Sequence, residues 1–402
     1  MMSERVDAVD FYSSQFTERP MYETEELVAL RDITRRFASE KIAPGYAARE
    51  KSAVLDRGLL KEMGTLGLIA PELPEWAGGT GVDTIYSGVI IEEIARADFN
   101  MGYAQILGSL EGQILARFAN KEVAENWLPK LTSGEVIINV ALTEPQGGSD
   151  AAALRLKMTN DGSDWLLNGE KTSISMVDQS EATVVFARSG DEERGARGVS
   201  ALLVPMDLPG IRTTRFKDLG QHCIGRGSIF FENVRVPGNM LLGNEGEAFS
   251  QVMQGFDFSR ALIGLQCLGT ARQSLDETWA FVKERRAFGQ LLSSFQGVSH
   301  KLAEFDTKVE AARLLCLNAL WLKDQGRPHT TEAAMSKWWP PLLAYETIHA
   351  CLLMHGHAGY SNDLPFEQRL RDVLGLQIGD GTAQIMKTVI ARSRVGRENV
   401  PY

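Results

Sequence analysis

The sequence predicts a multidomain α+β protein with an N-terminal helical domain, a middle β-barrel or sandwich domain and a C-terminal helical domain. Two changes in the spacing of apolar residues indicate this order, from helical to strand-like at Val136 and back to helical at Phe249. The length of 402 residues also favours several domains, because it exceeds what one small core organises. We expect the domains to span 1–135, 136–245 and 246–402.

Apolar residues at helical spacing fill the first domain. A first helix is expected to begin at Thr24 and end near Pro44, and a second covers 59–68. A longer helical stretch, 90–118, is expected to break at Asn100-Met101-Gly102, and a short helix follows at 123–131.

Short strand-like segments fill the second domain. The first covers 136–142, and the next, 154–158, alternates strictly between apolar and basic residues. The remaining strands are expected at 165–167, 182–187, 201–204, 211–216 and 228–236. Asn168-Gly169 predicts a hairpin turn between two of them, and turns recurring about every 8–12 residues are typical of a sandwich or barrel.

Helical spacing continues through the third domain, in stripes at 265–279 and 302–322 and in later helices up to Leu353 and over 382–395. Trp339-Pro340-Pro341 should kink or interrupt one of these helices, because proline lacks the N–H donor. The chain contains no GxGxxG, so no Rossmann dinucleotide site is expected.

Composition excludes several classes of function. The net charge of −10 argues against broad contact with nucleic acid or an anionic membrane, since both require a basic surface. No apolar stretch is long enough to span a membrane, and the N-terminus carries no evident export or transit signal. Four cysteines without CxxC spacing indicate structural thiols in a reducing compartment, the cytoplasm, with no metal site.

A glycine-flanked carboxylate near the end of the chain is the strongest candidate for chemistry. Asp380 lies between Gly379 and Gly381, immediately before a run with helical spacing. Thr382 and Gln384 should then fall at the start of that helix, where free N–H groups favour an anion such as phosphate. By itself a Gly-Asp-Gly sequence is more often a turn than a site.

Two polar segments of the β-domain offer further candidates. Thr143 and Ser149 lie in a glycine-containing loop that follows the first strand, where free N–H groups could hold a polar ring edge or a phosphate. Ser173 and Ser175 are expected on one side of a strand, because side chains alternate between faces. Each segment alone is ordinary loop or hairpin chemistry.

Taken together, these stretches resemble the acyl-CoA dehydrogenase family from about residue 25 to the C-terminus. The matching motifs, in order, are Thr143-Glu144-Pro145 with Gly148-Ser149-Asp150, Asn168-Gly169-Glu170-Lys171, Phe231-Glu232-Asn233-Val234-Arg235-Val236-Pro237, Phe256-Asp257 with Arg260, Arg285-Arg286-Ala287-Phe288-Gly289 with Gln296, and Gly379-Asp380-Gly381-Thr382. The resemblance implies a helical domain, a β-domain and a C-terminal four-helix domain, the order that the apolar spacing indicates.

The resemblance also implies an FAD site between the β-domain and the C-terminal helices, completed by a neighbouring subunit of a homotetramer. The residues at matching positions are Leu142, Thr143, Ser149, Ser173, Ser175, Arg285, Phe288, Gln296, Gly356, Thr382 and Gln384. Ser175 replaces the usual threonine whose hydroxyl lies near flavin N5, and Ser173 replaces a tryptophan that shields the ring. Arg285, Phe288 and Gln296 would hold the pyrophosphate and adenine of an FAD shared with the partner, whereas a glutamine usual before Gly356 is Leu353 here.

For catalysis, the resemblance implies that Asp380 removes the α-proton of an acyl-CoA while a hydride leaves the β-carbon. Most members carry glutamate at this position; others place the base where this chain has Ser259, which cannot act as one. The substrate would contact Ser149, Asp257, Arg260, Gly381 and Tyr103, the last on a helix that also carries Gln105 and Ile106. Asp257 and Arg260 could equally form a structural ion pair.

Within the family the sequence is most similar to cyclohexanecarboxyl-CoA dehydrogenases, with an electron-transfer flavoprotein as electron acceptor. Aspartate is one methylene shorter than glutamate, so its carboxylate lies about 1.5 Å further back, which a ring carbon at the α-position would suit. The alternatives are a dehydrogenase of another short or branched acyl-CoA, an enoyl-CoA reductase and a nitroalkane-oxidase-like flavoprotein. A non-catalytic scaffold is a fourth reading, which the retained carboxylate and hydroxyl disfavour.

Overall fold

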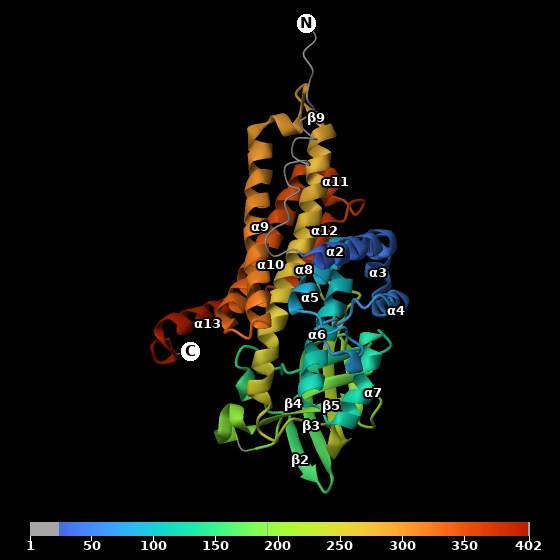
Figure 1. Cartoon of the computed structure of the whole chain (residues 1–402), viewed down its shortest axis with the longest axis vertical. Helices are drawn as coiled ribbons and strands as arrows, with labels where there is room; N and C mark the ends of the chain where they lie inside the picture. Colours follow the sequence, from blue (N-terminus) through green and yellow to red (C-terminus); the bar gives the residue numbers. More distant parts are fainter. Residues whose placement is uncertain (1–23, 191, 401–402) are drawn as a thin grey trace.

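The computed structural model describes residues 24–190 and 192–400, and Figure 1 shows helical segments above and around a β-domain at the lower end. The N-terminal helices are α2 (Glu25–Phe37), α3 (Tyr46–Ser52), α4 (Arg57–Thr65), α5 (Thr84–Ala97), α6 (Phe99–Phe118) and α7 (Lys121–Thr132). The hydroxyl of Thr24 caps α2 by accepting the Leu27 N–H at 3.2 Å. After Phe37 the chain continues as a π-helical turn, 38–42, and a 3₁₀ turn, 43–45, so the α-helix ends earlier than predicted.

The predicted break within the longest helical stretch was misplaced. It falls at Asp98, and Asn100-Met101-Gly102 forms the first turn of α6. Asp98 is extended and accepts the Asn100 N–H at 2.8 Å, while its other oxygen lies 2.7 Å from Arg49 Nε. A buried aspartate that caps one helix and pairs with an arginine from another therefore sets the corner between α5 and α6.

The β-domain consists of two sheet portions joined at one residue pair. Its strands are β1 (Ile138–Ala141), β2 (Lys157–Asp161), β3 (Asp164–Ser175), β4 (Ala182–Arg188), β5 (Val199–Pro205), β6 (Ile211–Arg215), β7 (Arg226–Pro237) and β8 (Leu241–Leu242). The order is β6-β7-β3-β2-β4-β5-β8, and β1 pairs in parallel with β4 along the edge that faces away from β5. Since β2 and β4 share only the pair Lys157–Arg188, the sheet can bend there around an apolar core.

Two strand predictions were wrong in detail. Asn168-Gly169 makes no hairpin turn, because both residues lie inside β3, where the register with β7 shifts between Leu167 and Gly169. A side chain at Gly169 would approach the Leu156 backbone to 3.1 Å, so this glycine permits close packing. The strand predicted at 154–158 begins only at Lys157. The backbone N–H groups of the two preceding residues, Arg155 and Leu156, donate instead to the carboxylate of Glu144.

Long helices build the C-terminal domain. They are α8 (Ala248–Glu284), α9 (Gln296–Asp324), α10 (Thr330–Met354), α11 (His357–Tyr360), α12 (Phe366–Gly375) and α13 (Ala383–Val395). The short strands β9 (Arg286–Ala287) and β10 (Gln290–Leu291) form a hairpin between α8 and α9. In Figure 1 this hairpin lies at the end of the molecule opposite the β-domain, while α13 projects sideways from the helical body.

The proline pair does not interrupt its helix, contrary to the prediction. α10 continues through Pro340 and Pro341, and both prolines are buried. Helix α8 approaches closely at Gly264, where an added Cβ would lie 2.7 Å from the Ser336 carbonyl oxygen and 3.4 Å from Pro340 Cγ. Tight packing against a glycine of the neighbouring helix thus supports α10 where backbone donors are missing.

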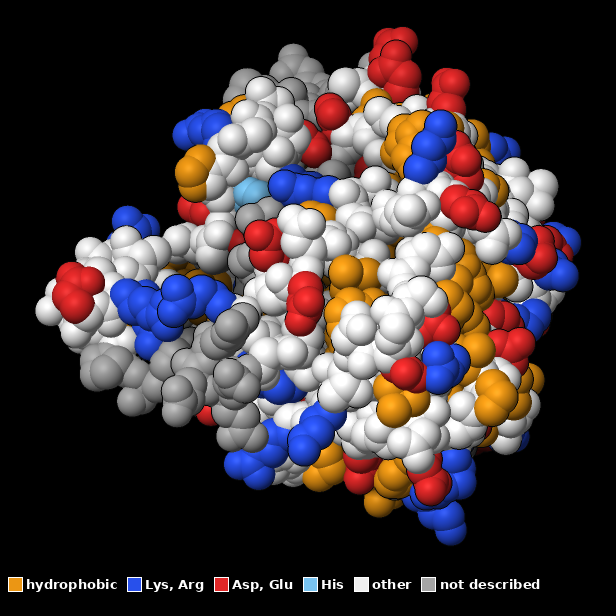
Figure 2. All heavy atoms as spheres, turned by 90° about the horizontal axis from the view of Figure 1, so that it is seen from below, with side chains coloured by type: hydrophobic (Ala, Val, Ile, Leu, Met, Phe, Trp, Pro, Cys, Tyr) orange, Lys and Arg blue, Asp and Glu red, His pale blue; other side chains and the backbone are white. Residues whose placement is uncertain are grey.

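The cores lie inside the helical body and inside the β-domain, and all four cysteines are buried free thiols. Across residues 24–190 and 192–400, no helix is long and apolar enough to cross a membrane. Figure 2 views the molecule from the β-domain end, and on this face Lys and Arg side chains are interspersed with Asp and Glu. On this face the two signs of charge are therefore mixed.

Candidate active site

Asp380 lies in the turn that connects α12 to α13. Its backbone has φ +56°, and the next residue, Gly381, has φ +102°. Aspartate tolerates the left-handed region better than most residues, whereas a side chain at Gly381 would also meet Met386 Cε at 2.6 Å. Thr382 is the N-cap of α13, as predicted, and its hydroxyl accepts the Ile385 N–H at 3.5 Å. The turn therefore holds Asp380 in one backbone conformation at a helix start.

The surroundings of Asp380 suit a strong carboxylate base. Burial raises the pKa of Asp380, while the charges of Lys337 and Arg260, the Ser259 hydroxyl and the charge of Arg226 all lower it. The Ser259 Oγ atom lies 3.4 Å from Asp380 Oδ2. The side chain is thus held among cationic groups that favour its ionised form and in an environment that strengthens its basicity.

Lys337 was missed in the sequence, although it lies at this turn. It is 1% exposed, and its Nζ donates to the Leu376 carbonyl at 2.7 Å and to the Gly381 carbonyl at 3.1 Å. Burial lowers the pKa of Lys337 to about 8. A lysine inside an otherwise apolar helical stripe was the available signal, because such a residue is rarely buried without a specific partner.

Arg260 and Asp257 form an ion pair one turn apart on α8. Their Nη1 and Oδ1 atoms lie 2.7 Å apart, and the second aspartate oxygen accepts the Thr330 hydroxyl at 2.6 Å. The Arg260 Nε atom is buried and has no hydrogen-bond partner within residues 24–190 and 192–400. The structural reading of the pair and a binding role for Arg260 are therefore compatible, since one donor is left over.

Tyr103 and Ser175 bring α6 and β3 together beside Asp380. Their hydroxyl oxygens lie 3.0 Å apart, and Asn139 Nδ2 donates to the Ser175 carbonyl at 3.0 Å. Burial and the Asp380 charge raise the pKa of Tyr103, which links this pair electrostatically to the carboxylate. Ser173 is exposed and has φ +60°, next to a register shift in β3. The two serines thus differ in environment.

A buried ion pair positions the loop that follows β1. Lys171 Nζ lies 2.7 Å from Glu144 Oε1 and donates to the Leu142 carbonyl at 3.0 Å. Burial lowers the pKa of Lys171 to about 8. Burial alone would raise the pKa of Glu144, but the Lys171 ammonium and the N–H donors of Leu156 and Arg155 together lower it. The Thr143 carbonyl accepts the Thr172 N–H at 2.9 Å. These contacts hold Leu142 and Thr143 beside β3, while Ser149 lies exposed further along the loop.

Four of the remaining predicted cofactor residues lie on the helical domain, away from the β-domain that carries Ser175. Arg285, Phe288 and Gln296 lie at the hairpin end of the helical domain (Figure 1), and Phe288 is 95% exposed with φ +51°. Gly356, at the end of α10, is exposed too, and Gln384 is exposed in the first turn of α13. One chain therefore presents two separated groups of predicted residues.

One further buried side chain near the candidate base was also missed. Both carboxylate oxygens of Glu111, on α6, are buried without a hydrogen-bond partner among the described residues. Burial, and after it the Asp380 charge, raises the pKa of Glu111 well above its ordinary value. Of the predicted acyl-pocket residues, Ile106 lies in the core instead and Gln105 donates to Ser109 at 3.3 Å.

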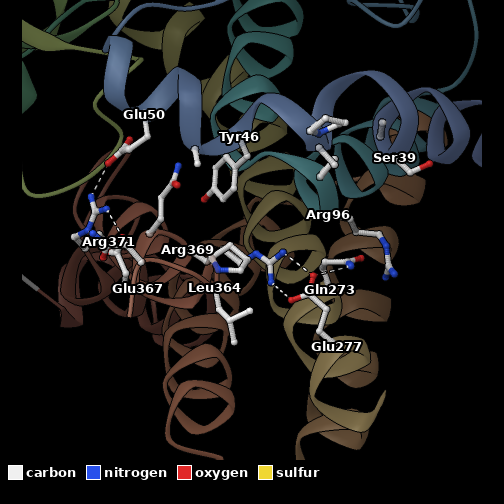
Figure 3. Close-up of a pocket in the computed structure, with 18 of the residues that line it drawn as sticks. Ser39, Tyr46, Glu50, Arg96, Gln273, Glu277, Leu364, Glu367, Arg369 and Arg371 are labelled. Carbon is white, nitrogen blue, oxygen red and sulfur yellow. Dashed lines mark hydrogen bonds and ion pairs between the residues drawn. The ribbon is translucent and has the colours of Figure 1, made fainter. Parts of the chain in front are cut away.

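A cavity of about 960 Å³ lies away from Asp380, between the N-terminal helices and α12. Figure 3 shows that its charged side chains point toward one another: Arg369 toward Glu277 and Arg371 toward Glu50 and Glu367. None of its lining residues is a predicted site residue. Because these arginines are already paired, we assign the chemistry to the Asp380 region instead.

Comparisons with known proteins agree along most of the described chain. The family models for the acyl-CoA dehydrogenase N-terminal, middle and C-terminal domains match residues 24–135, 139–234 and 246–394. The mitochondrial short-chain specific acyl-CoA dehydrogenase of Rattus norvegicus is 36% identical over 364 residues, which cover 90% of this chain and 88% of the relative.

Two solved structures extend the similarity. A chain from a study of the electron transferring flavoprotein of Acidaminococcus fermentans has a TM-score of 0.91 at 31% identity, covering 94% of this chain and 100% of its own. A glutaryl-CoA dehydrogenase of Mycobacterium smegmatis in complex with FADH2 has a TM-score of 0.88 at 25% identity, covering 94% and 96%.

Proposed function

Because the chain belongs to the acyl-CoA dehydrogenase family, we propose that it is an FAD-dependent enzyme that converts cyclohexane-1-carboxyl-CoA to cyclohex-1-ene-1-carboxyl-CoA. The class, an oxidoreductase acting on acyl-CoA, follows from membership of the family. The observation that carries the proposal is the convergence of α6, α8, α10 and β7 groups on Asp380. These segments are distant in sequence, so a turn alone would not require them to meet.

The residues present suit FAD, which accepts the β-hydride when bound. The flavin has a polar pyrimidine edge and a diphosphate, and the chain offers hydroxyl and backbone donors on the Leu142–Ser149 loop and at Ser175. Thr382 and Gln384 stand at a helix N-terminus, which favours phosphate. The loop is already held by Glu144 and Lys171, so it needs no rearrangement to present these groups.

The partner subunit of a homotetramer would complete this site. Arg285, Phe288, Gln296 and Gly356 lie on the exposed end of the helical domain, too far along the molecule to serve the Ser175 region of their own chain. A planar guanidinium can donate two hydrogen bonds to one diphosphate, and an exposed aromatic ring can stack on an adenine ring. We infer that these residues serve the neighbouring chain's cofactor.

Asp380 would act as the general base on the α-carbon. Its raised pKa increases its affinity for the proton, while the charges of Lys337 and Arg260 favour its ionised form. Its backbone N–H can donate to the thioester oxygen as negative charge develops there. Arg260, with its free Nε donor, and Asp257 would hold the CoA portion, together with Ser149.

The alicyclic substrate is inferred from the base and from its surroundings. Aspartate places the carboxylate about 1.5 Å behind the position that glutamate reaches, so the α-carbon must lie closer to the protein backbone. Ser173, in place of the family's tryptophan, would leave room beside the flavin, and the Tyr103 hydroxyl is engaged with Ser175. A saturated ring attached at the α-carbon fits both conditions.

Other substrates and partners follow the family comparison. A short or branched acyl-CoA is the main alternative, supported by similarity to the rat short-chain enzyme. An enoyl-CoA reductase or a nitroalkane-oxidase-like activity would use the same carboxylate. An electron-transfer flavoprotein is the proposed electron acceptor, in keeping with the Acidaminococcus structure, and the four buried free thiols suit the cytoplasm.

Anaerobic titration of the flavoprotein with a panel of CoA esters tests the proposal. We expect cyclohexanecarboxyl-CoA to bleach the oxidised flavin rapidly and butyryl-CoA and octanoyl-CoA to do so far more slowly. The reverse order would reject the alicyclic substrate while retaining the class. Bleaching by a nitroalkane, or oxidation of the reduced enzyme by an enoyl-CoA alone, would favour the corresponding alternative.

A further inference from the structure

Lys337 joins the two ends of the turn that carries Asp380. The Leu376 carbonyl, which accepts from its Nζ at 2.7 Å, belongs to the C-cap of α12. The Gly381 carbonyl, which accepts at 3.1 Å, immediately precedes the N-cap of α13. One ammonium group from a third helix, α10, therefore bridges the whole segment between α12 and α13.

Local contacts hold the first part of this turn: the N–H groups of Ile378 and Gly379 both donate to the Gly375 carbonyl at 3.2 Å. Leu376 is buried in the core, whereas Ile378 is exposed. Asp380 and Gly381, which follow, both have positive φ. Helix ends leave carbonyl groups without helical partners, and here the lysine satisfies one of them in a buried position.

The charge of Lys337 also acts on Asp380. It is the foremost of the groups that lower the pKa of this carboxyl, ahead of Arg260 on α8 and Arg226 on β7. Burial has the opposite effect on Asp380, and the charge of Asp380 in turn raises the pKa of Tyr103 and of Glu111 on α6. The lysine therefore supplies both hydrogen bonds to the turn and a positive charge to its side chain.

Packing alone does not account for a lysine at this position. Methionine would fill a similar volume inside α10 without the unfavourable desolvation of an ammonium group. The groups facing this ammonium are Asp380, Cys267 and Arg260, and of these only the carboxylate compensates it with a full charge. The residue thus makes sense as part of the Asp380 turn.

We propose that Lys337 is a positioning residue for the reaction: its two hydrogen bonds hold the 376–381 turn so that the Asp380 carboxylate is aimed at the α-carbon, and it places a positive charge near that carboxylate. The inference rests on the function proposed above, since it assumes that Asp380 is the base. In this role Lys337 acts through Asp380.

Two substitutions separate the hydrogen bonds from the charge. Lys337→Met removes both, whereas Lys337→Gln removes the charge but keeps an amide donor for one of the carbonyls. Lys323→Met, at a half-buried lysine of α9 outside the site, is the matched control. Stopped-flow flavin reduction by the most active CoA ester is followed from acid to alkaline pH, with FAD content and thermal melting measured for each variant.

We expect Lys337→Met to slow flavin reduction about 100-fold at neutral pH, as a displaced catalytic group would. The pH at which its rate rises should be about one unit higher than in the wild type, because Asp380 loses the nearby positive charge of Lys337. Lys337→Gln should show the same shift with a smaller loss of rate. Lys323→Met should match the wild type in both respects.

A loss of rate by one constant factor at every pH, or wild-type kinetics in both variants, would overturn the proposal. If Lys337→Met fails to fold, the pH profile of Lys337→Gln decides alone. A wild-type flavin that no CoA ester reduces would instead reject the proposed function, so the two failures are distinguishable.

Discussion

The hydroxyl oxygen of Ser259 lies 3.4 Å from the Oδ2 atom of Asp380, although 121 positions separate the two residues in the sequence. One residue is on the long helix α8 and the other is in the turn before α13. The two positions at which members of this family can carry a base, as the resemblance implies, are therefore neighbours in space. A carboxylate from either could serve the same α-carbon.

Moving the base tests this relationship. Asp380→Gly should abolish flavin reduction, and glycine suits φ +56° at that position. Adding Ser259→Glu to this variant should raise the rate at least about 10-fold above that of Asp380→Gly alone, because general-base catalysis contributes about 100- to 10,000-fold. Single-turnover reduction by the preferred CoA ester measures both variants. Equal rates in the single and double variants would show that the two positions do not share a target.

Removing only the basicity of Asp380 gives a second test. Asp380→Asn should keep FAD and bind CoA esters, since the amide has the same shape, but should slow flavin reduction about 100- to 10,000-fold. Spectral titration with substrate reports binding, and stopped-flow absorbance reports reduction. A rate within tenfold of the wild type would remove Asp380 from the role of base.

Lengthening the base tests the alicyclic substrate. Asp380→Glu advances the carboxylate by about 1.5 Å, so the geometry should now suit a straight chain better than a ring. We expect the ratio of rates for cyclohexanecarboxyl-CoA and butyryl-CoA to fall about tenfold or more. An unchanged ratio would mean that the length of the base does not select the acyl group.

Phe288 tests whether a second chain completes the cofactor site. The ring is 95% exposed in one chain, so Phe288→Ala should leave the stability of that chain within about 0.5 kcal/mol. It should nevertheless lower FAD retention and the tetramer fraction, measured by absorbance and light scattering. Val54→Ala, at an exposed residue of the N-terminal domain, is the control and should change neither. Full FAD retention in Phe288→Ala would argue against a shared site.

Asp372 should make stability depend on pH. This buried carboxyl accepts from Tyr46 Oη at 2.8 Å and from the Gln221 N–H at 2.6 Å, and burial, with the charges of Glu50 and Asp98, raises its pKa to about 7 from 3.8. Between pH 3.8 and about pH 7, Asp372 releases its proton in the unfolded chain but keeps it in the folded chain. The folded state is then progressively disfavoured as pH rises, by up to about 4 kcal/mol.

Asp372→Asn mimics the protonated acid at every pH. We expect its melting temperature to rise relative to the wild type as pH increases from 5 to 8, measured on FAD-loaded protein. Asp276→Asn, at a more exposed aspartate paired with Arg96, should show no such trend. A constant difference between Asp372→Asn and the wild type across this range would contradict the raised pKa.

Much of the fold was predictable because local patterns reflect burial. Apolar spacing placed the strands and helices in the right order, and the capping chemistry of Thr24 and Thr382 identified two helix starts. The errors arose where distant segments override a local signal. Asp98 ends α5 because Arg49 reaches it, and Gly169 stays in a strand because Leu156 lies against it.

The candidate base could be found from its glycine-flanked motif, but its environment could not. Lys337 and Glu111 carried no motif, and their proximity to Asp380 depends on how α10 and α6 pack. Arg285 and Phe288 were predicted from motifs, yet only the fold reveals that they lie apart from Ser175.

The sequence by itself determined which elements form, in what order, and that a carboxylate stands at a helix start, because these features depend on neighbours within a few positions. Tertiary structure alone decided which charges surround that carboxylate and how it is held. Electrostatic interactions depend on separation in space and on burial, and both are set by the packing of helices that are far apart along the chain.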